Sequence, residues 1–268
     1  MSALPLSGCI EGLGVLGPGI GSWPAAAAIL SGRTAWVSAP TALPLPEALP
    51  PPERRRTGAI VKLTLATGLE ATRHAGAVAA DLAAVFSSSG GDGVNCHEIC
   101  EALASSDPQV SPTRFTNSVH NAASGYWGIA TGATLAANAL CAYDGSFAAG
   151  LLEALTQVVI ERTRVLLVAY DAGYPEPIRA VRQIPDAFAV ALVLASQPGP
   201  ASLARIEAHL SDASADTLDE PALERLRTAI PAARSLPLLQ LLARGAGGDV
   251  VLDYLAHLRL AVTVSACR

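Results

Sequence analysis

Apolar runs separated by turn-forming residues dominate the pattern of this 268-residue chain. Apolar spacing of 3.6 residues, or strong helix formers, predicts helices at 57–75, 96–104, 117–131, 146–162 and 221–233, and residues 236–244 are Leu-rich. Continuous apolar or small-residue runs predict strands at 8–16, 79–86, 133–140, 165–170, 187–196 and 258–265. Strands alternating with helices favour one α/β domain over residues 1–268, with a mixed sheet covered by helices on both faces.

Turn-forming residues mark the connections. The Pro-rich stretch from Pro40 to Pro52 predicts an extended surface loop, because proline lacks the backbone N–H that a helix interior requires. Thr57 is placed to cap the helix that follows. Residues 87–93, rich in Ser and Gly, predict a loop after a strand, and no internal repeat is visible in the sequence.

The charge and the hydropathy of the chain exclude some classes of function. The net charge is −5 with only 18 basic residues spread over the chain, which excludes an electrostatic surface for nucleic acid or an anionic membrane. Charged residues make up 15% of the chain, against a usual fraction of about a quarter. Mean hydropathy is +0.38. We expect both a deeply buried sheet and a permanent apolar subunit interface.

Signals for export and membrane insertion are missing from the pattern. No Lys or Arg precedes Arg33, and the longest apolar runs, such as Ala187–Ala195, fall well short of the roughly 18 residues of a spanning helix. We expect a soluble cytoplasmic protein. Five scattered cysteines then predict free buried thiols, and Cys96, His97 and Cys100 predict the start of a helix rather than a metal site.

Residues 12–17 match the spacing G-x-G-x-x-G of dinucleotide sites. Such a site needs a helix N-terminus directly behind the glycines and an acidic residue about 20 positions later. Pro18 and Pro24 are expected to break that helix, and no carboxylate lies between Ser31 and Val37. The glycines therefore indicate a tight loop after the first strand, and no cofactor is expected. No hydrolase elbow, P-loop or zincin motif is present.

Two residues are candidates for chemistry. His120 lies among small and aromatic residues and is either a general base or a hydrogen-bonded core histidine. Cys141 follows a small-residue strand and precedes a helix, a position in which a helix dipole can activate a nucleophilic thiol.

Four segments together carry a resemblance to a known family. They are residues 86–93 (FSSSGGDG), 118–132 (SVHNAASGYWGIATG), 144–154 (DGSFAAGLLEA) and 191–196 (ALVLAS). The chain resembles the N-terminal half of the β-ketoacyl synthases over residues 8–200, and within them the short chain-length-factor-like branch linked to aryl-polyene clusters. The resemblance implies a truncated thiolase-like fold.

The resemblance also implies that the catalytic set is incomplete. Active ketosynthases carry the acyl chain on a cysteine between a strand and a helix, and they use two histidines from the C-terminal half. Alignment on Phe147 places the nucleophile position near Ala142 or Tyr143, so that Cys141 is out of register. The histidine motifs H-G-T-x-T and K-x-x-x-G-H are missing, and no catalytic residue is expected.

The implied function is a non-catalytic, chain-length-factor-like partner of a full-length ketosynthase in aryl-polyene, type II polyketide or fatty-acid-like synthesis. Residues 134–140 would pair across the twofold axis of a heterodimer, residues 117–131 would line the acyl tunnel, and an acyl carrier protein would dock mainly to the partner. The residues expected at the tunnel or interface are His120, Asn121, Tyr126, Trp127, Ile129, Tyr143 and Phe147.

Several alternatives stay open. Tyr126 and Trp127 could instead fill the core of this chain. The chain could be an acyltransferase with Cys141 as thioester nucleophile and His120 as base, or a binding module for hydrophobic acyl groups. Residues 200–268 could mimic the missing half or cover an exposed sheet edge.

Overall fold

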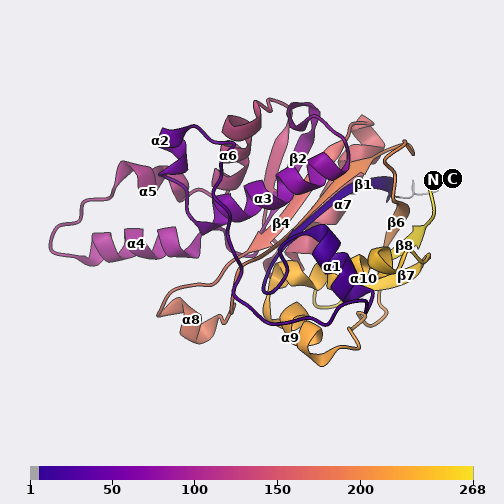
Figure 1. The fold of residues 1–268 in the computed structure, drawn as a ribbon. Helices are drawn as coiled ribbons and strands as arrows, with labels where there is room; N and C mark the ends of the chain where they lie inside the picture. Colours follow the sequence, from indigo (N-terminus) through magenta and orange to yellow (C-terminus); the bar gives the residue numbers. More distant parts are fainter. Residues whose placement is uncertain (1–5, 268) are drawn as a thin grey trace.

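An eight-stranded mixed sheet lies at the centre of the computed structural model, which describes residues 6–267 (Figure 1). The strand order is β3-β2-β4-β5-β1-β6-β8-β7; β2 is parallel to β3 and β4, and every other neighbouring pair is antiparallel. The strands are β1 (Leu6–Leu16), β2 (Ala83–Ser87), β3 (Ala137–Leu140), β4 (Val165–Asp171), β5 (Phe188–Ala195), β6 (Ala204–Ser211), β7 (Gly248–Asp253) and β8 (Arg259–Ser265).

Helices cover the sheet and form most connections. They are α1 (Trp23–Leu30), α2 (Pro51–Arg54), α3 (Ala59–His74), α4 (Gly93–Ala104), α5 (Pro112–Asn117), α6 (Ala122–Thr131), α7 (Ser146–Glu161), α8 (Ile178–Val181), α9 (Pro221–Ala229) and α10 (Leu236–Arg244), with 3-10 turns η1 (Ala79–Asp81), η2 (Tyr143–Gly145) and η3 (Pro231–Ser235). The predicted α/β class with a mixed sheet is confirmed.

Alternate residues of the central strands enter two separate cores. In β4, Leu167 and Ala169 face a core built with α1, α7 and α10, whereas Leu166 and Val168 face a core built with α3 and α6. Both faces are apolar, which explains the continuous apolar runs of β4 and β5.

The three strands added by the last third of the chain are covered on one face only. In β6, Ile206 and Ala208 are buried against the α7–α10 side, whereas Glu207 and His209 are exposed. Such alternation is typical of an antiparallel strand with one wet face. The prediction missed β6 and β7, because it relied on continuous apolar runs, and helices cover both faces only from β3 to β1.

A partial structural repeat relates the two ends of the sheet. The antiparallel pair β4–β5 lies beside β1, and the antiparallel pair β7–β8 lies beside β6. The strand order β4-β5-β1-β6-β8-β7 is therefore mirrored about the boundary between β1 and β6. In each half a helix on the same face precedes the pair, α7 before β4 and α10 before β7. Residues 204–265 therefore repeat part of the first half, without counterparts of β2 and β3 in the described chain.

Two glycines of the G-x-G-x-x-G motif lie inside β1 rather than in a loop. A Cβ on Gly12 would overlap the carbonyl oxygen of Ala71, and a Cβ on Gly14 that of Thr67, both on α3. The glycines thus let α3 pack directly on the strand. The expected loop is wrong, and so is the expected break at Pro24: α1 begins at Trp23, with Pro24 in its first turn, where the missing N–H costs nothing.

The helix predicted at 117–131 is interrupted at residues 118–121. The chain forms α5 up to Asn117, turns through residues 118–121, and begins α6 at Ala122. The first half of the strand predicted at 79–86 is the turn η1. Thr57 does not cap α3: Gly58 occupies the N-cap, and the Thr57 hydroxyl donates to the Arg54 carbonyl.

The helices α4 and α5 extend away from the sheet (Figure 1). Among the described elements, α5 alone packs substantially against α4, and Cys96 and Cys100 are exposed on α4, as is Cys141 elsewhere. The expectation of buried thiols is therefore wrong for these three, and only Cys9 is buried. Between residues 6 and 267, no three His, Cys, Asp or Glu side chains gather as a metal site, and no helix could cross a bilayer.

Candidate functional site

Three parallel strands have their carboxyl ends side by side, and the candidate residues gather there. β2 ends at Ser87, β3 at Leu140 and β4 at Asp171. Side chains at the carboxyl ends of neighbouring parallel strands come together in space, and loops there carry the sites of open α/β sheets. This strand end contains Cys141 and contacts His120.

Asp171 organises this strand end. Its Oδ1 accepts the N–H of Ser89 at 2.8 Å and the Ser89 hydroxyl at 2.6 Å, and its Oδ2 accepts the N–H of Ala232 at 2.8 Å. Burial raises the pKa of Asp171 to about 6, against the opposing effect of these hydrogen bonds. The carboxyl group connects the loop after β2 with η3 in the second half of the chain.

The loop after β2 is tightly packed. The hydroxyl of Ser88 accepts the N–H of Gly91 at 2.9 Å, and Asp92 caps α4 by accepting the N–H of Asn95 at 3.0 Å. The Tyr174 side chain lies where a Cβ on either glycine would be, with its hydroxyl at Gly90 and its ring at Gly93. This serine- and glycine-rich segment is therefore a fixed loop, and the glycines make room for an aromatic ring.

His120 and Cys141 reach the same strand end, but each binds a backbone carbonyl. His120 Nε2 lies 3.0 Å from the carbonyl oxygen of Leu140, so this nitrogen carries the proton. The Cys141 thiol donates to the carbonyl of Ser89 at 3.2 Å. Within residues 6–267 no hydrogen bond joins the imidazole to the thiol. The arrangement supplies no base for Cys141.

The turn between β3 and α7 presents Tyr143. This residue has φ of 51°, one of two non-glycine residues in the left-handed region among those described. Ser146 fixes the turn, since its hydroxyl accepts the N–H of Ala142 at 3.0 Å and donates to the Tyr143 carbonyl at 2.7 Å. The Tyr143 side chain is exposed at this strand-to-helix elbow.

Two arginines hold the elbow from outside. The Arg182 guanidinium lies 3.9 Å from the centre of the Tyr143 ring and donates to Asp144 at 2.6 Å. Arg234 donates to the other Asp144 oxygen at 3.1 Å. The Asp144 carboxylate thus binds both guanidinium groups, and the guanidinium of Arg182 covers the Tyr143 ring.

The predicted tunnel residues fall into two groups. Tyr126 and Trp127 are buried: the Tyr126 hydroxyl donates to Asn117 at 3.1 Å, and Trp127 packs against Phe86 with ring centres 6.5 Å apart. Phe147 is buried in the other core. This burial favours the alternative in which these aromatics fill the core of this chain. Ile129 is exposed on α6, Asn121 is exposed at the N-cap of this helix, and Gly125 is exposed between them at four-residue spacing.

The two edges of the sheet differ. At the β3 edge, Ala136 and Leu140 direct their carbonyls to β2, so the backbone of Ala137 and Ala139 faces outward, and no strand of the described chain pairs there. At the β7 edge, Asp216 exchanges hydrogen bonds with Val251: Val251 N–H donates to its carboxylate at 2.7 Å, and its own N–H donates to the Val251 carbonyl at 2.8 Å. One edge is open and the other is partly blocked.

Sequence reasoning missed Asp171 and the arginine pair as parts of this strand end. An aspartate that closes a wholly apolar strand is a usable signal, because a buried carboxylate must be hydrogen-bonded. No comparable signal marks Arg182 and Arg234, which reach Asp144 from segments 38 and 90 residues away.

Several solved structures that share this fold contain ketosynthases. A chain of the complex of the ketosynthase ApeO with its chain length factor ApeC, from Xenorhabdus doucetiae, superposes with a TM-score of 0.73 at 24% identity, over 96% of this chain and 99% of that one. A chain of the ishigamide ketosynthase/chain length factor gives 0.72 at 13% identity, over 98% and 100%.

A third structure contains AntDE and AntF, described as a type II PKS acyl-carrier protein in complex with its ketosynthase bound to the hexaketide. It gives a TM-score of 0.74 at 10% identity, over 98% of this chain and 100% of that one. At these identities the likeness shows the fold, which is the thiolase-like fold of ketosynthases. No functionally curated protein matches the sequence.

The family model described as β-ketoacyl synthase, N-terminal domain, matches residues 29–246. That match extends beyond the expected range of residues 8–200 into the partial repeat of the second half. The expected family and fold are therefore confirmed, and the chain belongs to the β-ketoacyl synthase family.

Proposed function

We propose that this chain is a non-catalytic, chain-length-factor-like subunit that pairs with a full-length ketosynthase in aryl-polyene or related polyketide or fatty-acid-like synthesis. The partner would supply the nucleophilic cysteine and the histidines, and an acyl carrier protein would dock mainly on that partner. This chain would act as one domain that provides a docking face and a wall of the acyl tunnel.

The elbow between β3 and α7 carries the proposal. Transfer of an acyl chain to the enzyme needs a nucleophile at the reacting position. The residue in the left-handed conformation at this turn is Tyr143, a phenol stacked under Arg182, whereas Cys141 precedes it by two positions and donates to a backbone carbonyl. A side chain clamped in this way is poorly placed for attack on a thioester.

The open edge of β3 supports a partner at this side of the molecule. An unpaired strand edge can recruit another chain unless it is blocked, and within residues 6–267 Asp216 partly blocks the opposite edge while no strand pairs with β3 on its outer side. Large apolar side chains are also exposed on α5, α6 and the segments that flank them. They are Phe115, Val119, Ile129 and Leu135. A second β3 would extend the sheet across a twofold axis and cover such side chains.

The exposed line on α6 supports a wall function. Asn121, Gly125 and Ile129 follow one another at four-residue spacing on the uncovered side of this helix. Since Tyr126 and Trp127 hold α6 against β2 and α3, the helix is a rigid support for Ile129. A close-packed wall limits the length of an acyl chain, because another two-carbon unit would have to displace packed atoms.

The second candidate function is an acyltransferase that uses Cys141. One observation favours it: the thiol is exposed and lies at the same strand end as His120. In that case, incubation with an acylated carrier protein would add the acyl mass to Cys141.

Coexpression with a full-length ketosynthase from the same organism tests the proposal. We expect a stable heterodimer on size-exclusion chromatography and chain elongation that requires both subunits. A complex carrying Cys141→Ala should make the same products at the same rate. Elongation of a malonyl-derived chain by this protein alone, or acylation of Cys141, would refute the non-catalytic role.

A further inference from the structure

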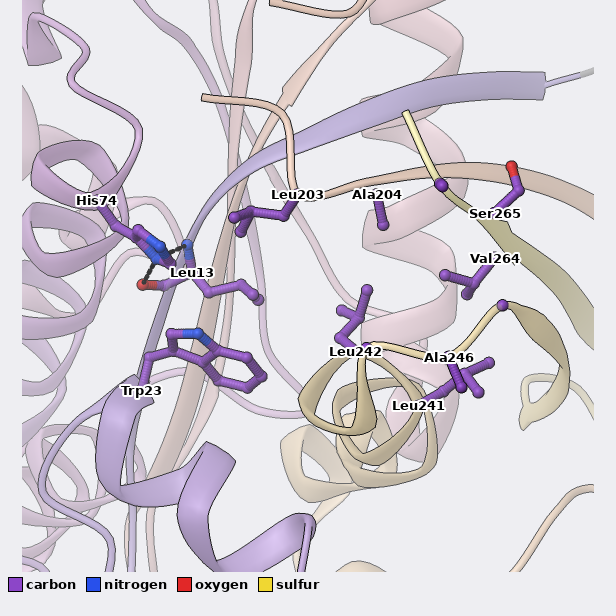
Figure 2. Close-up of a pocket in the computed structure, with 13 residues that line it drawn as sticks. Leu13, Trp23, His74, Leu203, Ala204, Leu241, Leu242, Ala246, Val264 and Ser265 are labelled. Carbon is purple, nitrogen blue, oxygen red and sulfur yellow. Dashed lines mark hydrogen bonds between the residues drawn. The ribbon is translucent and has the colours of Figure 1, made fainter. Parts of the chain in front are cut away.

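A pocket of about 290 Å³ lies where the two structural halves of the sheet meet, far in sequence from the elbow residues (Figure 2). Its walls come from β1, α1, the end of α3, the start of β6, α10 and β8. Leu13, Trp23, His74, Leu203, Leu242 and Val264 are among the lining residues. None of the residues proposed for the acyl tunnel or the interface lines it.

A split in the sheet creates this pocket. β1 pairs with β6 only from Leu6 to Ile10, and the register of β1 against β5 shifts between Ile10 and Gly12, which marks a bulge at Glu11. Beyond the bulge, β1 leaves β6. Side chains of α3 then replace the missing strand: His74 Nδ1 accepts the N–H of Leu13 at 3.1 Å, and Glu70 accepts that of Val15 at 3.0 Å.

The pocket has a polar end with two N–H groups. His74 Nδ1 lies 3.1 Å from the backbone nitrogen of Leu13 and 3.4 Å from its carbonyl oxygen. We assign the shorter contact as the hydrogen bond, in which Nδ1 accepts the Leu13 N–H and the proton of the neutral ring is on Nε2. The Trp23 indole has its nitrogen edge on the side of Leu13 and His74 (Figure 2). Neither His74 Nε2 nor Trp23 Nε1 has a hydrogen-bond partner among residues 6–267, so both can donate to a ligand.

The other end is apolar. Leu203, Leu242 and Val264 face the same space from three different elements (Figure 2). Small-molecule sites share this composition, with apolar walls and a few convergent polar groups. At about 30 Å³ per water-sized unit, the volume suits a ligand of roughly ten non-hydrogen atoms.

Charge decides between a neutral and an anionic head group. Glu70 lies beside the polar end, where its carboxylate accepts the backbone N–H groups of Val15 at 3.0 Å and Trp23 at 2.7 Å. A ligand carboxylate would be placed near this acidic group and would lose hydration without gaining a fixed cation. A carbonyl needs only donors, and the two N–H groups provide them.

We propose that this pocket binds a small uncharged acyl compound, with a short apolar chain among Leu203, Leu242 and Val264. Its carbonyl oxygen accepts hydrogen bonds from His74 Nε2 and Trp23 Nε1. The site does not depend on the proposed pairing with a ketosynthase, because no interface residue contributes to it.

Titration calorimetry of the full chain, alone and in its complex, tests this site with methyl heptanoate as the neutral probe and heptanoate as its charged counterpart. We expect saturable binding of the ester with one site per chain, and at least about tenfold weaker binding of the carboxylate. Equal binding of both probes, or no saturable binding of the ester up to its solubility limit, would overturn the proposal.

Two variants locate the ligand. Leu242→Trp fills the pocket from α10 and should abolish binding, whereas Leu103→Trp, on the exposed arm of α4, should leave it unchanged. His74→Asn keeps an acceptor for Leu13 N–H but removes the Nε2 donor, and should weaken ester binding about five- to tenfold, the loss of one hydrogen bond. Circular dichroism checks that each variant is folded. Ester binding that survives Leu242→Trp in a folded chain would refute the assignment.

Discussion

The carboxylate of Asp171 accepts a hydrogen bond from the backbone N–H of Ala232 at 2.8 Å and so joins the two halves of the chain, across 61 residues. The contact lies in the interior, where Asp171 is 2% exposed. A carboxyl group at such a position favours its neutral form, because burial removes the hydration of the charge. Stability should therefore respond to pH through this residue.

The folded-state pKa of Asp171 is raised from 3.8 to about 6. Stabilisation from its protonation is complete below about pH 3.8 and is lost as the pH rises through 6, by on the order of 3 kcal/mol. Asp171→Asn should lower stability at acidic pH by removing an acceptor for Ala232, and this deficit should shrink between pH 4.5 and 7. Urea unfolding at several pH values measures it, with the exposed Asp212→Asn as control. A deficit independent of pH would contradict the assignment.

Close packing of α3 on β1 gives a second prediction. Gly12→Ala or Gly14→Ala would drive a methyl group into the α3 backbone, at Ala71 or Thr67. We expect a loss of about 1–3 kcal/mol or more in the free energy of unfolding, as for an overpacked core. Gly21→Ala is the matched control, because no atom lies within 4 Å of the added Cβ.

Chemical denaturation of the three variants measures the difference. Equal stability of Gly12→Ala and Gly21→Ala would show that helix and strand do not approach as closely as described. A change in nucleotide binding is not expected in any of them, since the glycines serve packing.

The fully buried strands were predictable from the sequence, whereas two half-buried strands, β6 and β7, were missed. β4 and β5 place apolar residues on both faces, so a continuous run identifies them. β6 alternates Ile206 and Ala208 with polar residues, and β7 alternates buried Val250 and Leu252 with less buried residues, so neither forms a continuous apolar run. The break between α5 and α6 was missed because apolar residues continue at helical spacing through the turn at 118–121.

For the candidate site, the sequence identified the residue types but not which of those side chains would be buried. Trp127 and Ile129 are two positions apart and both are bulky candidates for a wall, yet the first lies against Phe86 in the core and the second is exposed. Their faces depend on the rotation of α6 on the sheet, which is set by its packing on α3 and β2. Likewise, the left-handed conformation of Tyr143 depends on the turn that Ser146 fixes.

The open β3 edge gives a third prediction. Ala137→Pro removes an outward N–H at the first residue of an edge strand, a position where proline is tolerated, so the chain should stay folded. If a partner pairs with this edge, the heterodimer should be lost or weakened at least about tenfold on size-exclusion chromatography or by titration.

The opposite edge supplies the control. Asp216→Ala unblocks β7 by removing the acceptor for Val251 N–H and should leave heterodimer formation intact, while promoting self-association at high concentration. Light scattering distinguishes the two effects. If Ala137→Pro pairs normally with the ketosynthase, the interface does not run through β3.

Product length distinguishes Ile129 from Trp127. Ile129→Trp enlarges a side chain on the exposed face of α6, so it should shorten the product of the complex if that face closes the tunnel, without changing the thermal stability of the isolated chain. Trp127→Ala removes the partner of Phe86 and leaves a cavity beside Gly68, so it should cost about 3–5 kcal/mol of unfolding free energy. Mass spectrometry of the products, with Ile160→Trp on the exposed side of α7 as the control, measures the first effect. If product length responds to Trp127→Ala in a stable complex but never to Ile129→Trp, the wall is built from the core aromatics and the exposed face of α6 has another role.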